Sequence, residues 1–342
     1  MARSAEGPRA RTLEEVAAAA GVSKSTVSRV VNGSPAVSPA ARDVVQRTIA
    51  RTGYRPNRAA RSLVTRRTGS IGLIVSEPEG RVFSDPFFAS MVRGVSDVVR
   101  DRDVQLVLVL ADDAKAQRQV LDYLRDGHLD GALLISSHAA DPLPRTLVAE
   151  GLPAALSARP VFPLPVSYVD VDSAAGAALA VAHLAGRGRR RIATIAGPQD
   201  MSAGQDRLTG WRHAVRHAGL AVEEDLVGYG NFTRASGARA MEQILAAGDP
   251  PDGLFAASDL MALGALAVLA EHGLRVPHDV AVVGFDDSVA AMEARPPLTT
   301  VHQPVEEMGR RMAQLLAARI RREQVEDSHV LLDTHLVRRA SA

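Results

Sequence analysis

The sequence contains no cysteine, and only 4% of its 342 residues are aromatic. Without cysteine, neither disulfides nor thiolate metal sites can form, which agrees with a reducing compartment. The first residues, M-A-R-S-A-E-G-P-R-A-R, lack the apolar core of a secretory signal peptide. The longest apolar stretch, residues 254–270, is interrupted by Ser258 and Asp259, which favours a strand end and a buried helix over a membrane span. We therefore expect a cytoplasmic protein with no membrane partner.

Recognisable catalytic motifs are also missing. The sequence has no nucleophile elbow, phosphate-binding loop or metal-ligand cluster. Its ten histidines are scattered, and the acidic pair Asp112 and Asp113 has no partner at useful spacing. We expect no enzymatic activity, no metal and no cofactor.

The formal net charge of +1 hides an uneven distribution. Residues 1–67 hold 13 basic and 4 acidic residues, a charge of +9, whereas the remainder holds 27 basic and 35 acidic residues, a charge of −8. A basic head on an acidic body fits a head that binds phosphates and a body that does not compete for the duplex. An unstructured basic arm is the alternative, but the charges lie within segments that have helix-capping residues. The length allows two or three domains with large cores.

The stretch T-L-E-E-V-A-A-A-A-G-V-S-K-S-T-V-S-R-V-V-N, which begins at Thr12, predicts a helix, a tight turn and a second helix. Thr12 and Glu15 have the spacing of a capping box. Gly21 lies where the chain must turn sharply, since glycine tolerates positive φ. Ser23 is the natural N-cap of the second helix, which we expect to end near Asn32.

A third helix is expected to begin at Pro39, after the capping residue Ser38, and to end near Gly53. The three helices would enclose a small apolar cluster, and about 50 residues is near the lower size limit for independent folding. The side chains expected to face this cluster are Leu13, Val16, Ala17, Val27, Val30, Val31, Val44, Val45 and Ile49.

The outward, N-terminal part of the second helix would meet base edges and phosphates. An ordinary amphipathic hairpin has the same helical spacing, but the neighbouring basic segments favour a DNA-binding unit. The predicted DNA contacts of this head are Thr12, Ser23, Lys24, Ser25, Thr26, Ser28, Arg29, Asn32 and Tyr54.

A short basic segment follows the third helix. Pro56 prevents that helix from continuing, and Asn57 can cap one and a half turns of new helix. Such a short helix is unstable alone, so the segment is a candidate for folding on contact with DNA. A plain linker with an incidental leucine is the alternative. The predicted DNA contacts here are Asn57, Arg58, Ala60, Arg61 and Leu63.

From Gly69 onward, apolar strands alternate with amphipathic helices, beginning with S-I-G-L-I-V. This alternation predicts parallel sheets with helices on both faces. It recurs in a second half, from about Ile192 to Phe285. Two α/β lobes in one chain place a ligand cleft between them, at the carboxyl ends of the strands.

These features together resemble the LacI/GalR family of bacterial transcription regulators, from about Thr12 to Arg339. The resemblance implies an all-α helix-turn-helix headpiece joined by a hinge helix to a two-lobed α/β effector domain of the periplasmic-binding-protein-like (type I) fold. It also implies a homodimer on a pseudo-palindromic operator. One hinge helix from each subunit would enter the minor groove, where Leu63 is wedged between base steps and Ala60 lies where the hinges touch.

The implied organisation has a disordered arm at 1–10, a headpiece at 11–54 and a hinge helix at 55–67. Residues 68–342 would form the effector-binding and dimerisation domain. Its N-terminal lobe would comprise about 69–168 and 303–330, and its C-terminal lobe about 169–302 and 331–342.

The resemblance also implies a set of effector contacts. Arg207 would bind paired acceptors with its guanidinium fork, Phe232 would stack on a ring, and Asp286 would accept hydroxyl hydrogen bonds. The alternatives are an ion pair between the lobes, from Arg207 to Asp286, and burial of the phenylalanines in the core. The predicted effector-binding residues are Asp85, Phe87, Phe88, Arg207, Phe232, Ser258, Asp286 and Gln303.

Two positions depart from the family pattern. Ala158 stands where an aspartate is usual, and Ser258 where an asparagine is usual. Losing these polar groups changes which ligand fits, so a typical hexose is in doubt and another sugar, a nucleoside or a less polar metabolite stays open. We expect Arg159 to form a surface ion pair and Asp287 to cap a helix or loop.

The resemblance implies a bacterial repressor of a carbohydrate or related catabolic or transport operon, associated with the nucleoid when bound. Whether the effector induces or co-represses stays open. The sequence shows no tetramerising leucine heptad near its end, so we expect a dimer. A solute receptor without a DNA role and an enzyme that uses the cleft are the competing classes; a mobility-shift assay tests the first and turnover of a bound metabolite the second.

Overall fold

The computed structural model describes residues 12–31, 34–54, 67–100, 104–323 and 329–342. Two compact units divide the chain, Met1–Thr68 and Gly69–Ala342.

The first unit contains the three predicted helices, α1 (Leu13–Ala20), α2 (Lys24–Val31) and α3 (Pro39–Thr52). The capping box before α1 is present, because Thr12 Oγ1 accepts from the Glu15 N–H and Glu15 Oε2 accepts from the Thr12 N–H, at 3.3 and 3.1 Å. Gly21 has a φ of 65°, as the turn requires. Ser23 Oγ accepts from the Thr26 N–H at 3.1 Å. Local capping therefore fixes where these helices begin.

The core of the first unit is small and mostly valine. Val16, Val27 and Val45 are fully buried. The prediction that Val44 faces inward was wrong, because 37% of its surface is exposed. Adjacent helical residues lie about 100° apart, so Val45 and Thr48, which is 5% exposed, take the inward positions instead.

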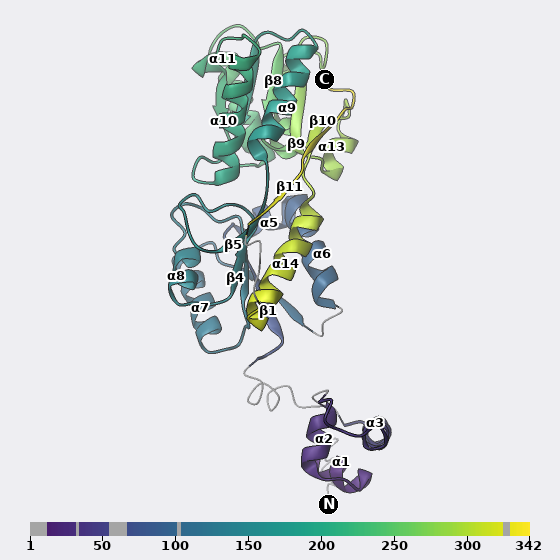
Figure 1. Ribbon diagram of the computed structural model, residues 1–342. Coiled ribbons are helices and arrows are strands. Elements are labelled where there is room, and N and C mark those ends of the chain that lie inside the picture. The colour runs from purple at the N-terminus through teal and green to yellow at the C-terminus, as the bar shows by residue number, and fades with distance from the viewer. Residues whose placement is uncertain (1–11, 32–33, 55–66, 101–103, 324–328) are drawn as a thin grey trace, which may run out of the picture. The chain divides into compact units, whose positions relative to one another are not determined.

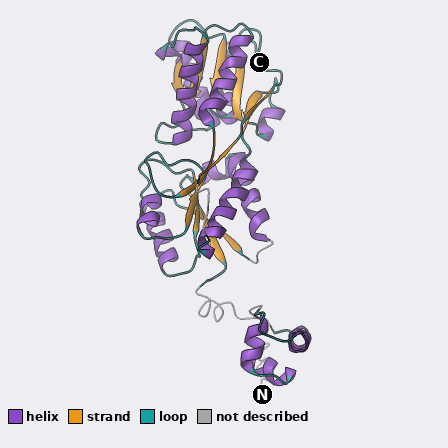
Figure 2. Ribbon diagram, in the orientation of Figure 1, coloured by secondary structure: helices purple, strands orange, loops and turns teal. Residues whose placement is uncertain are grey.

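The second unit has two lobes, each built on a six-stranded sheet between helices (Figures 1 and 2). The first sheet is parallel throughout, in the order β11-β5-β4-β3-β1-β2. Its strands are β1 (Ser70–Val75), β2 (Gln105–Leu110), β3 (Ala132–Ile135), β4 (Ala154–Leu156), β5 (Ser167–Val171) and β11 (His329–Leu332).

The helices of the first lobe cover both faces of this sheet. One core lies under α6 (Pro86–Arg100) and α14 (Val305–Arg321), which lie side by side, blue and yellow, in Figure 1. The other lies under α7 (Ala114–Arg125) and α8 (Leu143–Ala149). The short α5 (Glu79–Ser84) precedes α6.

The second sheet has the order β12-β10-β9-β8-β6-β7, and only the β10–β12 pair is antiparallel. Its strands are β6 (Ile192–Ala196), β7 (Val227–Tyr229), β8 (Gly253–Ala256), β9 (Ala281–Asp286), β10 (Thr299–His302) and β12 (His335–Val337). Its helices are α9 (Ser173–Gly186), α10 (Ser202–His217), the 3-10 turn η1 (Glu224–Leu226), α11 (Arg234–Ala246), α12 (Asp259–Glu271) and α13 (Val289–Glu293). Two cores again form, one under α11 and α12 and one under α9 and α10.

The chain passes between the lobes three times, after β5, after β10 and after β11. Two of these passages come slightly later than the lobe limits predicted at 168 and 330. The reason is that Val169–Val171 and Leu331–Leu332 still pair within the first sheet. The carboxyl ends of the strands of both sheets thus lie next to the three segments that connect the lobes.

Candidate nucleic-acid interface and ligand cleft

The second helix, α2, presents a polar surface on its N-terminal half. Ser23, Lys24, Ser25 and Arg29 are exposed, and Thr26 and Ser28 are half-buried. The three side chains at the helix start are held together, because Ser23 Oγ lies 2.8 Å from both the Ser25 and the Thr26 hydroxyls. This arrangement preforms the surface that a major groove would meet.

Lys24 has a partner within this unit. Its ammonium forms an ion pair with Glu14 of α1, and both side chains are mostly exposed. The hydrogen bond from Lys24 lowers the pKa of the Glu14 carboxyl. A phosphate that binds Lys24 therefore has to replace a carboxylate. Thr12, the first predicted contact, is exposed but engaged in its capping box.

Tyr54 differs from the other predicted DNA contacts. Only 8% of its surface is exposed, and it packs in the core with Val16 and Val27. The structure therefore gives Tyr54 a packing position. The remaining predicted contacts lie outside the described residues, and they are Asn32, Asn57, Arg58, Ala60, Arg61 and Leu63.

A cleft lies between the two lobes of the second unit, with an empty volume of about 1040 Å³ that includes open solvent at its mouth. The predicted effector residues that line it are Asp85, Phe87, Arg207, Phe232, Ser258, Asp286 and Gln303. The structure thus brings together residues from six separate segments of the chain.

Phe88 is the exception. Its ring is 3% exposed and packs in the first-lobe core against Met91 and Val95. Phe87, its neighbour, meets it edge-on at 5.4 Å and takes the cleft position. Because adjacent helical residues point about 100° apart, only one of the two could face the cleft.

Arg207 is anchored in the cleft by several neighbouring groups. It is 4% exposed, and its guanidinium donates to the Ala257 carbonyl at 2.7 Å and to Gln303 Oε1 at 2.8 Å. The same group lies 3.6 Å from the centre of the Phe285 ring and 3.7 Å from Asp286 Oδ1. The ion pair with Asp286 exists, but both residues belong to the second lobe, so it does not join the lobes. A guanidinium held from so many sides keeps a fixed orientation toward ligand oxygens.

Phe232 belongs to the second lobe, as Arg207 does, and its position depends on a glycine. A Cβ on Gly197 would lie 2.4 Å from two atoms of the Phe232 ring, so only glycine leaves room for it. The guanidiniums of Arg81 and Arg207 lie 5.4 and 5.8 Å from its centre. Because Arg81 belongs to the first lobe, this ring is in contact with cations from both sides of the cleft.

Three carboxyls in the cleft are hard to ionise. Burial raises the pKa of Asp286 well above its ordinary range, and Arg207 opposes this rise. Burial also raises the pKa of Asp85 and of Asp170, while backbone N–H donors oppose the rise in each. Carboxyls in such buried surroundings are stabilised by hydrogen bonds from ligand hydroxyls.

Backbone strain concentrates at the same place. Among the described residues, five other than glycine have positive φ, and Ser136, Phe232 and Asp286, at 58°, 65° and 118°, line the cleft. Asp287, at 59°, follows directly. Strain of this kind persists where the surrounding structure holds a side chain in position, as it does at binding sites.

The two positions that depart from the family pattern both line the cleft. Ser258 Oγ accepts from the Met261 N–H at 3.2 Å, so it caps α12 and is not fully available to a ligand. Asp287 caps nothing; it pairs with Arg339 at 2.6 Å and with His302 at 3.0 Å, which corrects the prediction of a cap.

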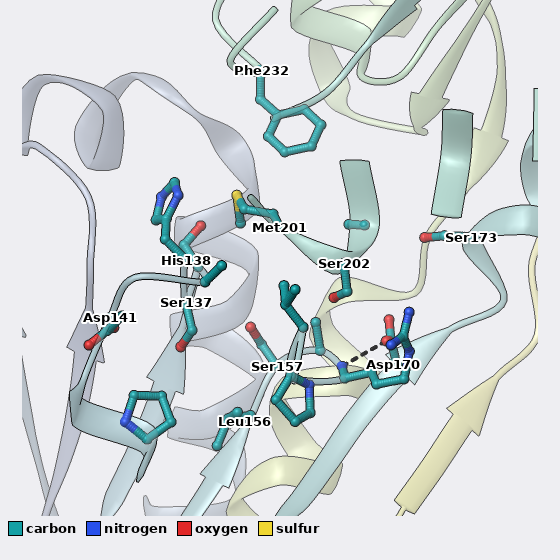
Figure 3. A pocket seen from close by; sticks show the side chains of 18 of the residues that line it. Ser137, His138, Asp141, Leu156, Ser157, Asp170, Ser173, Met201, Ser202 and Phe232 are labelled. Atoms are coloured by element: carbon teal, nitrogen blue, oxygen red, sulfur yellow. Dashed lines mark hydrogen bonds between the residues drawn. The ribbon is translucent and has the colours of Figure 1, made fainter. Parts of the chain in front are cut away.

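Several lining residues were not among the predicted effector contacts, although a charge in the cleft was the alternative role considered for Arg159. Arg159 of the first lobe lines the cleft and also forms the expected ion pair, with Asp206 of α10 at 2.9 Å. His138 lies between the lobes, with Nδ1 2.8 Å from Asp200 and Nε2 3.2 Å from Glu77. Further polar side chains of the lining include Ser137, Asp141, Ser157, Asp170, Ser173 and Ser202, all labelled in Figure 3. The sequence feature that could have predicted these lining residues is the short serine-rich loop that follows several strands.

The described part of the chain contains no group of three or more His, Asp or Glu side chains that could hold a metal ion. Of the helices described, none has the length and apolar character needed to cross a bilayer.

Comparison with known proteins agrees with this geometry. A model of bacterial regulatory proteins, lacI family, matches residues 12–57, and a model of the periplasmic binding protein-like domain matches residues 181–342. The HTH-type transcriptional regulator CelR of Thermobifida fusca is 50% identical over 338 residues, which cover 98% of this chain and 99% of that protein. The chain belongs to the lacI family of bacterial regulatory proteins.

Solved structures of the lacI family extend over both units. A CelR–cellobiose complex has a TM-score of 0.78 and 48% identity, covering 97% of this chain and all of that one. A lac repressor dimer bound to operator and the anti-inducer ONPF has a TM-score of 0.83 and 28% identity, covering 97% and 99%. The predicted fold class and function are confirmed: this is a ligand-responsive, DNA-binding transcription regulator.

Proposed function

We propose that this regulator represses an operon for uptake or breakdown of a glucose disaccharide with a β-linkage, of the cellobiose type. The observation that carries the proposal is the interlobe cleft built around Arg207, with hydrogen-bonding carboxyls and aromatic rings on its walls. Sugars present hydroxyl edges and apolar C–H faces, which such walls match. The likeness to a CelR–cellobiose complex supports this class of ligand.

The cleft explains how a ligand acts on the lobes. Asp85 and Phe87 come from the first lobe, and Arg207 and Asp286 from the second. A ligand that contacts both sets binds the closed arrangement more tightly than an open one, and so shifts the population toward closure. Coupling to DNA is reciprocal: an effector that weakens operator binding must bind the operator complex more weakly by the same factor.

The DNA side rests on α2. Lys24, Ser25 and Arg29 would meet phosphates and base edges, and Glu14 would release Lys24 when a phosphate binds. The segment 55–67 would supply hinge contacts in the minor groove of a pseudo-palindromic operator.

A homodimer is part of the proposal, since a two-fold operator needs two heads. Exposed apolar side chains supply candidate contacts: Val107 and Leu108 on the edge strand β2, and Val289 and Met292 on α13 are 36–57% exposed. Edge strands and apolar patches of this kind are typical of subunit interfaces. We further propose that the protein acts in the cytoplasm, at the nucleoid when bound, without cofactor or catalytic activity.

The test is operator selection followed by titration. Fragments of the source genome that bind the full chain are selected and footprinted, and binding to the selected fragment is measured by fluorescence anisotropy with and without cellobiose. We expect a protected pseudo-palindrome and a change in affinity on adding cellobiose.

Arg207→Ala is the matched variant: it should keep DNA binding and lose the response to cellobiose. No enriched fragment, with or without cellobiose, would refute operator recognition. A normal response in Arg207→Ala would remove this side chain from the effector site.

A further inference from the structure

The cleft continues into the first lobe beyond the part that both lobes share. Its lining extends between the end of β4, the first turn of α8 and the loop 157–164. Figure 3 shows Leu156 and Asp141 toward one end of the lining and Phe232 at the other. We name this end the outer compartment, and it is lined by Asp141, Pro144, Arg145, Leu156, Phe162 and Leu164. The inner compartment is the part around Arg207, Asp286 and Phe232.

The outer compartment has mostly apolar walls. Leu156 and Pro144 are buried and Leu164 is half-buried. Phe162 remains 49% exposed, and the guanidinium of Arg145 lies 4.8 Å from the centre of its ring. The Phe162 ring, in contact with a cation, offers a face that fits the apolar side of a second sugar ring, with the Arg145 donor beside it.

A polar boundary separates the two compartments. The Ser137 hydroxyl is buried and, among the described residues, has no hydrogen-bond partner. Ser157, 7% exposed, lines the cleft nearby (Figure 3). A buried hydroxyl without a partner costs free energy that a ligand oxygen at this point would recover.

We propose that the outer compartment receives the second ring of a disaccharide, with Phe162 and Arg145 as the residues that select two rings over one. This inference rests on the proposed carbohydrate effector and deepens it. The inner compartment draws residues from both lobes, whereas the outer one belongs wholly to the first lobe. Binding of the second ring therefore increases the affinity for the disaccharide without further favouring the closed arrangement of the lobes.

The experiment uses the full chain and calorimetric titration with cellobiose and with glucose. Phe162→Ala should raise the Kd for cellobiose by about tenfold and leave that for glucose within about twofold. Arg145→Ala should act in the same direction, and Phe162→Trp should restore cellobiose binding. Tyr123→Ala is the control, since Tyr123 is an equally exposed aromatic of the same lobe outside the cleft lining.

A second readout follows the operator. Phe162→Ala should require more cellobiose for half its effect on DNA binding, yet reach the same maximal effect. Equal loss of glucose and cellobiose affinity, or no change in either, would overturn the outer compartment while leaving the carbohydrate effector in place. If the unaltered protein binds neither sugar, the proposed effector class itself is wrong and this inference falls with it.

Discussion

His138 gives a prediction that the structure makes quantitative. It joins the lobes, because its ring lies between Glu77 of the first lobe and Asp200 of the second. Hydrogen bonding to Glu77, assisted by Asp200 and opposed by burial, raises its pKa from 6.5 to about 9. At neutral pH the imidazole is therefore protonated and ties the two lobes together.

The rise in pKa sets the magnitude of the effect. A change from 6.5 to about 9 corresponds to roughly 3 kcal/mol at about 1.36 kcal/mol per unit. Since 28% of the side chain is exposed, screening by water reduces this to on the order of 2 kcal/mol. The pKa is higher in the folded state, so the stabilisation is complete below pH 6.5 and is lost as the pH rises through about 9.

The measurement uses the single tryptophan, Trp211, which is fully buried in the second lobe and reports on the second unit alone. Urea unfolding followed by its fluorescence is compared at about pH 6 and about pH 10. His138→Gln should lose on the order of 2 kcal/mol less stability across this range than the unaltered protein. The control is His272→Gln, because His272 forms an exposed pair with Glu242 at 3.5 Å. Parallel losses in the unaltered protein and in His138→Gln would refute the argument.

Three further predictions concern other positions. Gly197→Ala should displace the Phe232 ring and raise the Kd for cellobiose by about tenfold, while operator affinity stays unchanged. An unchanged Kd in titration calorimetry would show that this ring does not contact the ligand. Lys24→Ala should lower the slope of log operator affinity against log salt concentration by about one phosphate contact, whereas Glu14→Ala should strengthen operator binding. Fluorescence anisotropy at several salt concentrations measures both effects. An unchanged slope in Lys24→Ala would exclude a phosphate contact by Lys24. Asp259→Asn should lower the free energy of unfolding of the second unit, measured in urea, by about 1–3 kcal/mol, because the Asp259 carboxyl accepts from the Thr300 hydroxyl and the Ser288 N–H. An unchanged free energy of unfolding would mean that these two hydrogen bonds make no net contribution to stability.

Much of the fold followed from local patterns. The capping residues Thr12, Ser23 and Ser38 mark helix starts that the structure confirms, because such hydrogen bonds span only a few residues. Helix α10, in contrast, begins at Ser202 without a side-chain cap. Its N-cap position, Met201, makes no side-chain capping bond, so the sequence contained no start signal there.

The cleft was predictable only in part. Arg207 and Asp286 were expected from the family pattern, but Phe88 was placed in the cleft although only Phe87 faces it. His138 was missed because its partners lie 61 and 62 residues away, and no local spacing shows that such groups meet. Contacts between lobes depend on how the whole second unit folds, which a single sequence does not show directly.

The connectivity of the chain has a consequence for how such regulators diversify. A single boundary, after residue 68, separates the DNA-reading unit from the sensor. One recombination event at that boundary can therefore combine a new operator preference with an old effector. The two lobes of the sensor are joined by three passages of the chain. They cannot be exchanged by one such event, so effector preference is expected to change residue by residue within an inherited sensor.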